Sequence, residues 1–301
     1  MTELSSIIFD KYQIRKSKKQ KTEFINLLKE YMPINIQQGG LLKSRNIIVG
    51  DVEKADVIFT AHYDTCAVMP FPNFITPKNI VFYLAYSVLI LMPMFLVLTV
   101  FNAVLTIVIT NFWFHYVLNL LILGMFIYLL MAGPANKHTA NDNTSGVVTL
   151  CEIYSKLTDE HKQKVALVFF DNEEIGLIGS ALFKNQYAKI MENKLLVNFD
   201  CVSDGDHILF AISKAAQNEY LEKISRVFEA NDKNIMIEKG EKIFYPSDQK
   251  HFKKNIAVAA LKHNEFIGYY MDKIHTPKDI VFDKRNIELL SEGAIKLADM
   301  I

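Results

Sequence analysis

Charged residues are missing from one long part of this 301-residue chain, because residues 79–136 contain no Asp, Glu, Lys or Arg. Leu, Ile, Val, Phe, Met and Tyr fill the stretch instead. This composition excludes a solvated surface segment, and core helices of a soluble protein usually keep a polar stripe. About 20 apolar residues span a bilayer as a helix. The stretch therefore predicts two transmembrane spans, near residues 80–101 and 112–131, in preference to a pair of buried core helices.

Cysteine is also scarce, and neither sign of charge is in excess. The three cysteines, Cys66, Cys151 and Cys201, are odd in number and far apart, which gives no disulfide framework and suits a reducing compartment. With 33 basic and 33 acidic residues, the chain gives no reason to expect nucleic acid as a partner. No basic segment leads into an apolar core at the N-terminus, so we expect no cleavable signal peptide.

The two predicted spans form a hairpin, which returns the chain to the side of the membrane from which it entered. Lys78 and Lys137 flank the outer ends of this hairpin, while its turn, expected at Asn102 or Asn111, carries no charge. This distribution follows the positive-inside rule. We therefore expect the rest of the chain to lie in the cytoplasm.

Outside the hairpin, apolar runs of strand length alternate with segments of helical periodicity. One amphipathic helix is expected where Phe24, Leu27, Leu28 and Tyr31 recur before Pro33. The alternation predicts an α/β domain with a mixed, mostly parallel sheet flanked by helices. Further helices are expected at residues 147–157, 179–191, 215–230 and from 286 onwards, and strands at 46–49, 57–61, 165–170, 195–199, 234–238 and 256–261.

Five basic residues lie close together near the N-terminus. A cluster of this kind can contact anionic lipid. Charge runs are more commonly the solvated face of a helix, and we favour that interpretation here. The residues are Arg15, Lys16, Lys18, Lys19 and Lys21.

Carboxylates stand where two of the predicted strands end. The run of residues 165–170 is closely followed by Glu173 and Glu174, and the run of residues 195–199 by Asp200. In α/β proteins, ligands gather at the ends of such strands. A solvated loop would explain one acidic pair, but carboxylates after two neighbouring strands favour a binding site.

His62 and Asp64 follow the strand expected at residues 57–61. Residues two apart on an extended chain lie on the same side, so the Asp64 carboxylate is placed to orient the His62 imidazole, as carboxylates commonly do for metal-binding histidines. A lone histidine at a strand end is more often structural. Cys66 is a weaker candidate ligand, because a free cysteine is more commonly a small buried side chain than a metal ligand.

Three further polar segments belong to the candidate site. Asp142 stands just before a predicted helix, where capping is the default role for Asp. His275 lies in a turn broken by Pro277. The loop of residues 244–252 is too polar for the core and is predicted to be an active-site loop.

Two imidazoles and three carboxylates from strand ends and turns are enough ligands for two metal ions. Zinc accepts nitrogen and oxygen ligands of this kind, and a bridging carboxylate can hold two ions together. Glu173 is then left free to handle a proton. The candidate ligands are His62, Asp142, Glu174, Asp200 and His275.

The order of these motifs resembles the cocatalytic di-zinc aminopeptidase family, whose relatives include glutamate carboxypeptidase, glutaminyl cyclase and the transferrin-receptor ectodomain. The family pattern of His, any residue and Asp is matched at residues 62–64, and its Glu-Glu at 173–174. Its Asp three residues before Ser-Gly, its strand-end Asp and its His-Thr-Pro-x-Asp are matched at Asp142, at Asp200 and at 275–279.

This resemblance covers about residues 40–301 apart from the hairpin, and it implies a fold of the zinc-exopeptidase type. The implied zinc peptidase domain comprises residues 1–78 and 137–301, with residues 79–136 inserted as a transmembrane hairpin. Two zinc ions are implied as cofactors, with a peptide as substrate and the lipid bilayer as a further partner. Gln249 departs from the family, which commonly has His there, and this leaves the substrate pocket open.

The resemblance also implies a role for each candidate residue. Asp142 would bridge the two zinc ions, in place of the capping role. Glu173 would be the general base that takes a proton from the attacking water, and Tyr245 stands where relatives have an oxyanion donor. The remaining ligands would divide between the ions, with His62 and Asp200 on one, Glu174 and His275 on the other, and Asp64 supporting His62.

These expectations combine into a membrane-anchored zinc aminopeptidase that hydrolyses the N-terminal bond of short or apolar peptides. Asp142 follows Lys137 by only five residues, and an extended chain covers at most about 3.3 to 3.6 Å per residue, so the site should lie close to the bilayer. A carboxypeptidase, a glutaminyl cyclase-like acyl transferase and a non-catalytic membrane receptor or scaffold are the alternatives.

Overall fold

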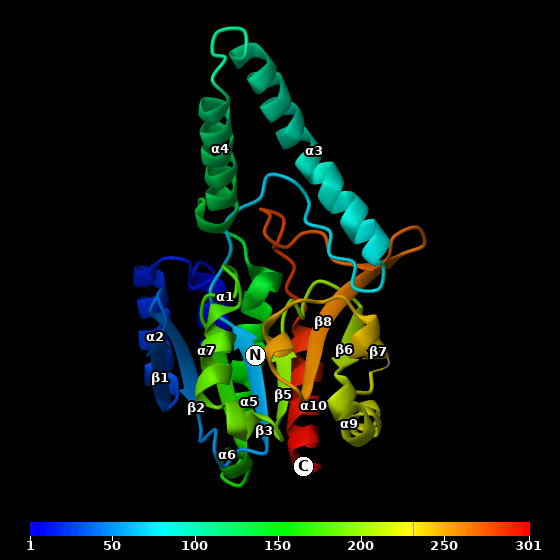
Figure 1. Cartoon of the computed structure of the whole chain (residues 1–301). Helices are drawn as coiled ribbons and strands as arrows, with labels where there is room; N and C mark the ends of the chain where they lie inside the picture. Colours follow the sequence, from blue (N-terminus) through cyan, green and yellow to red (C-terminus); the bar gives the residue numbers. More distant parts are fainter. Residues whose placement is uncertain (231) are drawn as a thin grey trace.

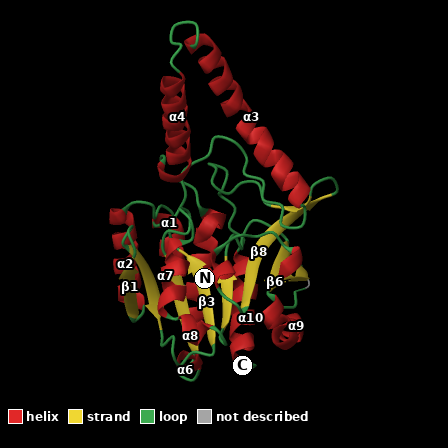
Figure 2. Cartoon of the chain, viewed as in Figure 1, coloured by secondary structure: helices red, strands yellow, loops and turns green. Residues whose placement is uncertain are grey.

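A mixed sheet lies at the centre of the computed structural model, which describes residues 1–230 and 232–301 (Figure 2). The strands follow the order β1 (Ile34–Gly39), β2 (Ser44–Val49), β4 (Val165–Phe170), β3 (Val57–His62), β5 (Leu195–Phe199), β8 (Asn255–Asn264), β6 (His207–Ile212) and β7 (Asn234–Lys239), and β9 (Gly268–Tyr270) pairs with β8.

The four central strands, β4, β3, β5 and β8, run parallel to one another. Every residue of β3, β4 and β5 is buried, as expected for continuous apolar runs that helices cover on both faces. The pairings β1–β2, β2–β4 and β6–β8 are antiparallel. The α/β sheet is therefore mixed, as predicted, but parallel pairing is confined to its centre and to β6–β7.

Alternate side chains of the central strands point to opposite faces, and each face packs against its own helices. Phe59 and Leu167 pack on one face, whereas Ile58 and Val168 pack on the other. The first face is covered by α1 (Glu3–Lys11), α2 (Lys18–Tyr31), α5 (Gly146–Lys156), α9 (Lys214–Val227) and α10 (Lys284–Asp299), the second by α7 (Ile178–Gln186) and α8 (Ala188–Met191), and the short α6 (His161–Lys164) leads into β4.

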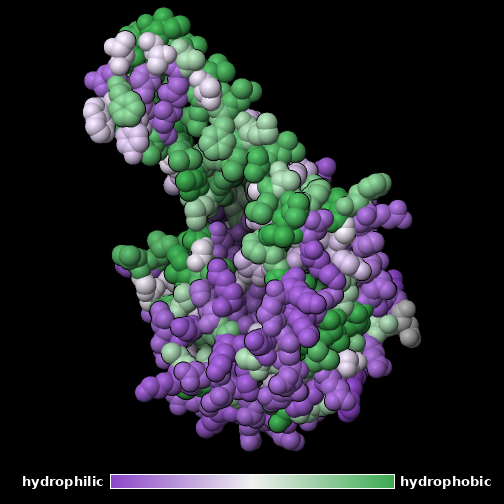
Figure 3. Space-filling model, turned by 45° about the vertical axis from the view of Figure 1, so that its right-hand side comes forward, coloured by the Kyte–Doolittle hydropathy of each residue, from purple (hydrophilic) through white to green (hydrophobic). Residues whose placement is uncertain are grey.

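Two long helices, α3 (Ile80–Leu105) and α4 (Phe112–Ala132), project from the sheet domain (Figure 1). Neither helix contains a buried residue, and hydrophobic side chains cover most of the projecting part (Figure 3). At 1.5 Å per residue they are about 39 and 32 Å long, and their mean hydropathy reaches 2.5 and 2.0. Both are thus long and apolar enough to cross a bilayer core of about 30 Å.

The limits of these two helices lie close to the predicted ones. Asn111 stands at the start of α4, where its side chain accepts a hydrogen bond from the Phe114 N–H. Asn102, the other residue expected at the turn, lies inside α3.

The other predicted elements are present with ends shifted by a few residues, apart from one helix. The helix expected at residues 179–191 is divided at Tyr187 into α7 and α8. The sequence did not predict α1, α6, β1, β6 or β9.

Candidate metal centre

The ends of three parallel strands bring the first candidate residues together. His62 is the last residue of β3, Glu173 and Glu174 follow β4, and Asp200 follows β5. Because β4, β3 and β5 are parallel neighbours, their carboxyl ends meet at the same edge of the sheet. This edge faces the projecting helices (Figure 1).

Asp142 lies between the two histidines of the site. Its Oδ1 is 3.3 Å from His62 Nε2, and its Oδ2 is 2.9 Å from His275 Nε2. A second carboxylate stands beside each histidine, since Asp200 Oδ1 is 3.4 Å from His62 Nε2 and Glu174 Oε2 is 3.1 Å from His275 Nε2. The donors therefore form two groups, and the two oxygens of Asp142 face one group each.

The loop before α5 holds Asp142 in this position. The first N–H of α5, that of Gly146, donates a hydrogen bond to Asn143 Oδ1 at 3.0 Å and not to Asp142. The Asp279 carboxylate accepts hydrogen bonds from the backbone N–H groups of Asn141 and Asp142, at 2.8 and 3.0 Å. Asp142 is thus free of the capping role, and the loop that carries His275 is fastened to it.

Asp64 contacts His62 through its backbone oxygen, and its carboxylate contacts the loop of Glu173 and Glu174. Its carboxylate accepts hydrogen bonds from the backbone N–H groups of Glu173 and Glu174, at 2.9 and 3.3 Å. His62 Nδ1 lies 3.1 Å from the backbone oxygen of Asp64 but 3.8 Å from Oδ1, too far for a hydrogen bond. The backbone carbonyl therefore fixes the imidazole, and the carboxylate positions Glu173 and Glu174.

Negative charge is concentrated in this buried site. Burial raises the pKa of Glu173 well above its ordinary value, and the charge of Glu174 adds to the effect while His62 opposes it. Burial also raises the pKa of Glu174. Burial disfavours ionised Asp142, but hydrogen bonds from His275 and His62 hold its pKa below the usual range. Burial lowers the pKa of both histidines, and the surrounding carboxylates outweigh it and raise the pKa well above the ordinary value.

The donor set fits metal cations, and zinc in particular. His62, Asp142, Glu174, Asp200 and His275 all line a pocket of about 300 Å³. The Oε1 atom of Glu174 is buried and has no hydrogen-bond partner among the described residues. Buried carboxylates are costly unless they are paired or coordinate a metal, and imidazole nitrogen and carboxylate oxygen are both zinc ligands.

Four residues around the site have a left-handed backbone. They are Asn172, Leu177, Cys201 and His275, with φ angles of 57°, 58°, 55° and 62°. Such conformations cost about 1–3 kcal/mol each in residues other than glycine and tend to cluster at functional sites.

Tyr245 and Gln249 come from the predicted active-site loop. Tyr245 lines the pocket, and its hydroxyl donates a hydrogen bond to the backbone oxygen of Asp200 at 3.1 Å. Burial raises the pKa of Tyr245 well above its ordinary value. Gln249, which departs from the family pattern, is buried and accepts a hydrogen bond from Asn198 Nδ2 at 3.1 Å, so its side chain supports the loop.

The basic segment near the N-terminus is only partly a solvated face, which corrects the sequence-based interpretation. Arg15 is fully buried. Its Nε donates to the Tyr63 backbone oxygen at 2.5 Å and one of its terminal nitrogens donates to Thr144 Oγ1 at 3.1 Å. Arg15 therefore ties together the segments that follow β3 and precede α5.

Lys21 is the second buried cation of this segment, and it accounts for two residues that the sequence left without a role. Its Nζ lies 2.5 Å from Asp171 Oδ1 and 2.6 Å from Asn172 Oδ1. Arg15 and Lys21 carried no sequence signal because their partners lie far away in the chain. Asn143 and Asp279 stood inside recognised motifs, which was a usable signal.

The fold and the donor set are those of a metal-dependent hydrolase of the zinc-exopeptidase class. The model of peptidase family M28 matches residues 126–297, and the chain belongs to this family. Membership implies zinc dependence and peptide substrates. The matched range includes Asp142, Glu174, Asp200 and His275, whereas His62 and the weaker candidate Cys66 lie before it. Comparison with curated protein sequences finds no match.

Solved structures with similar folds include enzymes of more than one activity. The LapA aminopeptidase of Legionella pneumophila aligns with a TM-score of 0.56 and 14% identity, covering 98% of this chain and 69% of that one. Glutaminyl cyclase of Porphyromonas gingivalis gives 0.55 and 16%, covering 99% and 96%. A Zn-dependent exopeptidase from Parabacteroides distasonis gives 0.55 and 13%, covering 98% and 96%. At these identities the likeness establishes the fold alone.

Proposed function

We propose that the protein is a membrane-anchored di-zinc exopeptidase, and most specifically an aminopeptidase that cleaves short or apolar peptides. The single observation that carries this proposal is the position of Asp142, whose two oxygens face two separate histidine–carboxylate groups. A carboxylate in that position suits two metal ions held side by side.

Five residues would hold the two ions. When bound, zinc supplies Lewis acidity toward the substrate carbonyl and lowers the pKa of the attacking water. The ligands of the first ion would be His62, Asp200 and Asp142, and those of the second Glu174, His275 and Asp142. Asp64 would keep Glu173 and Glu174 in place through its hydrogen bonds to their backbone.

Glu173 is the proposed general base. Its carboxylate lies close to His62 and Glu174, and it forms no ion pair with the described residues. Burial raises its pKa, which favours acceptance of a proton from water and its transfer to the leaving amine. Tyr245 is the proposed oxyanion donor, which requires its hydroxyl to turn from the Asp200 carbonyl toward the substrate.

The hairpin of α3 and α4 is the proposed membrane anchor, inserted into the peptidase domain formed by residues 1–78 and 137–301. Water would be a poor solvent for so much exposed apolar surface. Phe112, Trp113 and Tyr116 are exposed at the far end of α4, as in the aromatic belts of membrane interfaces. Lys78 and Lys137 at the near ends support a cytoplasmic peptidase domain.

A peptide panel tests the proposed activity. Detergent-purified protein should release the N-terminal residue from short apolar peptides, and N-acetylation should abolish cleavage because an aminopeptidase requires the free amine. Cleavage that survives acetylation but requires a free C-terminus would indicate a carboxypeptidase instead. Release of ammonia from N-terminal Gln peptides would identify the second candidate, a glutaminyl cyclase, whose fold this chain shares.

A further inference from the structure

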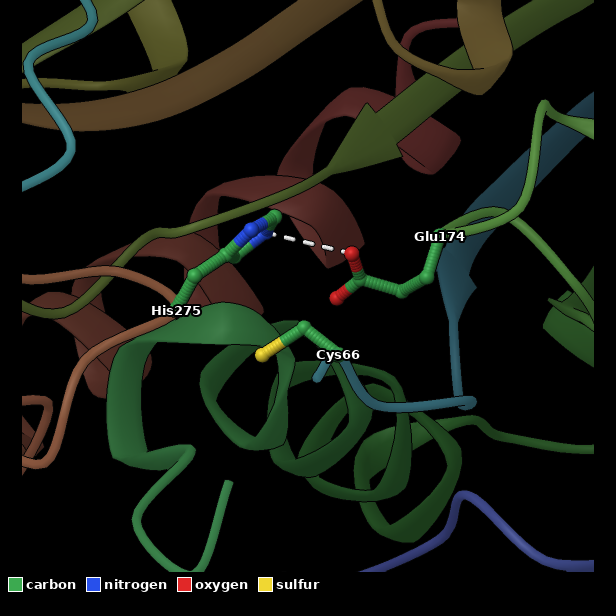
Figure 4. A group of neighbouring side chains, drawn as sticks. All are labelled: Cys66, Glu174 and His275. Atoms are coloured by element: carbon green, nitrogen blue, oxygen red, sulfur yellow. Dashed lines mark ion pairs between the residues drawn. The ribbon is translucent and has the colours of Figure 1, made fainter. Parts of the chain in front are cut away.

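Cys66 lies beside the second half of the metal centre (Figure 4). Its Sγ and one ligand atom each of Glu174 and His275 all lie within 4.8 Å of one another. The residue is buried, with 2% of its surface exposed. The three side chains come from separate segments and converge on one space, which is the usual construction of a metal site.

Backbone hydrogen bonds fix the position of this thiol relative to His275. The Met69 N–H donates to the backbone oxygen of His275 at 2.7 Å, and the Asn136 N–H donates to that of Cys66 at 3.2 Å. Asn136 also donates through its side chain to the backbone oxygen of Thr276 at 2.9 Å. The Cys66 segment, the base of the hairpin and the His275 loop are therefore fastened to one another.

An unpartnered carboxylate oxygen points independently to a cation at this place. Oε2 of Glu174 faces His275 at 3.1 Å, whereas Oε1 is buried without a partner among the described residues. In Figure 4 this second oxygen lies on the side of Cys66. A buried oxygen of this kind is costly unless a cation or donor satisfies it.

We propose that Cys66 is a thiolate ligand of the zinc ion that Glu174 and His275 hold. Binding forms a zinc–sulfur bond and releases the thiol proton to solvent, with no change of oxidation state. With Asp142, this ion then has four protein ligands, the number typical of a closed site, whereas His62, Asp200 and Asp142 leave the other ion with an open position. The inference rests on the proposed function only for the presence of two ions.

The consequence is that the two ions differ in role and in affinity. The ion that Cys66, Glu174, His275 and Asp142 hold would be bound more tightly, because thiolate ligands favour zinc over harder divalent ions. The ion that His62, Asp200 and Asp142 hold would be the exchangeable one and would keep the position for water. Removal of Cys66 should therefore lower the affinity for the ion that Glu174 and His275 hold, and leave the affinity for the other ion unchanged.

Cobalt substitution of the full-length protein in detergent tests this assignment. The cobalt-loaded wild type should show a near-ultraviolet thiolate-to-cobalt charge-transfer band, and Cys66→Ser should lose it. Cys201→Ser and Cys151→Ala are matched controls with buried thiols and should keep the band. A wild type without the band, a band that persists in Cys66→Ser, or one that disappears in Cys201→Ser would overturn the proposal.

A measurement on the wild type covers the case in which Cys66→Ser does not fold. Zinc X-ray absorption should show a sulfur neighbour at about 2.3 Å, and neighbours limited to nitrogen and oxygen would contradict the assignment. Neither readout depends on catalysis. If the peptide panel fails while the sulfur neighbour is present, the proposed function is wrong and the role of Cys66 stands.

Discussion

At the scale of single residues, the site depends on two neighbours with different contacts, Asp142 and Asn143. Both stand before α5, and Asn143 accepts a hydrogen bond from the first N–H of the helix, that of Gly146. Asn143 also donates to the backbone oxygen of Phe199 at 3.0 Å, which ties the loop to the end of β5. Because Asn143 accepts the hydrogen bond from Gly146, the Asp142 carboxylate can face the two histidines.

Glu173→Gln should reduce the turnover of peptide by about 10²- to 10⁴-fold, the usual contribution of a general base. Zinc content should be unchanged, because Glu173 is not a proposed ligand. Glu192→Gln, at an exposed position after α8, is the matched control and should retain activity. Full peptidase activity of Glu173→Gln in a steady-state assay would refute the assigned base.

Lys21→Met should destabilise the protein by about 3–5 kcal/mol, because it leaves the buried Asp171 carboxylate without its cation. Thermal or denaturant unfolding in detergent measures the loss. Lys19→Met is the control, since Lys19 is exposed and its pair with Glu23 is 4.0 Å long, and it should change stability by less than about 0.5 kcal/mol. Equal effects of the two substitutions would show that the buried pair has no special role.

At the scale of elements, the hairpin is held together by a polar contact in an apolar setting. The side chains of Asn102 in α3 and Asn119 in α4 exchange hydrogen bonds at 2.8 and 3.0 Å. His115 also contacts Asn102 Oδ1 at 3.2 Å. Interhelical hydrogen bonds of this kind join helices in a membrane, where no hydrophobic force acts between them.

A double-mutant cycle with Asn102→Leu and Asn119→Leu should reveal this contact. We expect a coupling free energy of about 0.6 kcal/mol, the average for polar pairs in membrane proteins, in thermal unfolding in detergent. The exposed Thr99→Leu, combined with Asn119→Leu, should show additive effects. Additive effects of the Asn102 and Asn119 substitutions would mean that the two side chains do not interact.

The sequence predicted the elements that carry a strong local signal. The strands β3, β4 and β5 were recognisable because they are buried on both faces and therefore read as continuous apolar runs. The hairpin helices were recognisable because they are apolar on all sides. In contrast, β1 is mostly polar and only partly buried, and β9 has three residues, so neither shows a periodic pattern. The split of α7 and α8 at Tyr187 has no Pro or Gly to mark it.

The candidate ligands were predictable for a different reason, namely the order of short motifs along the chain. That order cannot show which atoms meet. Asp64 does lie beside His62, but its backbone oxygen contacts the ring, while its carboxylate accepts hydrogen bonds from the backbone of Glu173 and Glu174. The burial of Arg15 depends on Tyr63 and Thr144, which are distant in sequence and leave no local trace.

At the scale of the whole molecule, the metal centre and the hairpin both lie at the edge of the sheet where the parallel strands end. Lys16 Nζ donates to the backbone oxygen of Met131 at 2.7 Å, next to the end of α4. Lys78 also forms an ion pair with Glu238 of β7. If the hairpin crosses a membrane, the pocket is held close to the lipid surface and receives substrates from that region.

Reporter fusions at the C-terminus, Ile301, test this arrangement. A reporter that is active only in the cytoplasm should give signal, and one that requires export should not. Both ends of the hairpin would lie on the same side, and Lys78 and Lys137 at these ends favour the cytoplasm. The fusion protein should remain with the membrane after alkaline extraction. Signal only from the exported reporter would refute the cytoplasmic orientation, and release by alkali would refute the anchor.

The most direct test of the dinuclear centre is the zinc content of the detergent-purified wild type, measured by elemental analysis together with the Asp142→Ala variant. The position of Asp142 between two histidine–carboxylate groups predicts two zinc ions per wild-type chain, and fewer in the variant. One zinc ion per wild-type chain, or two that remain in Asp142→Ala, would contradict a bridging role for this residue.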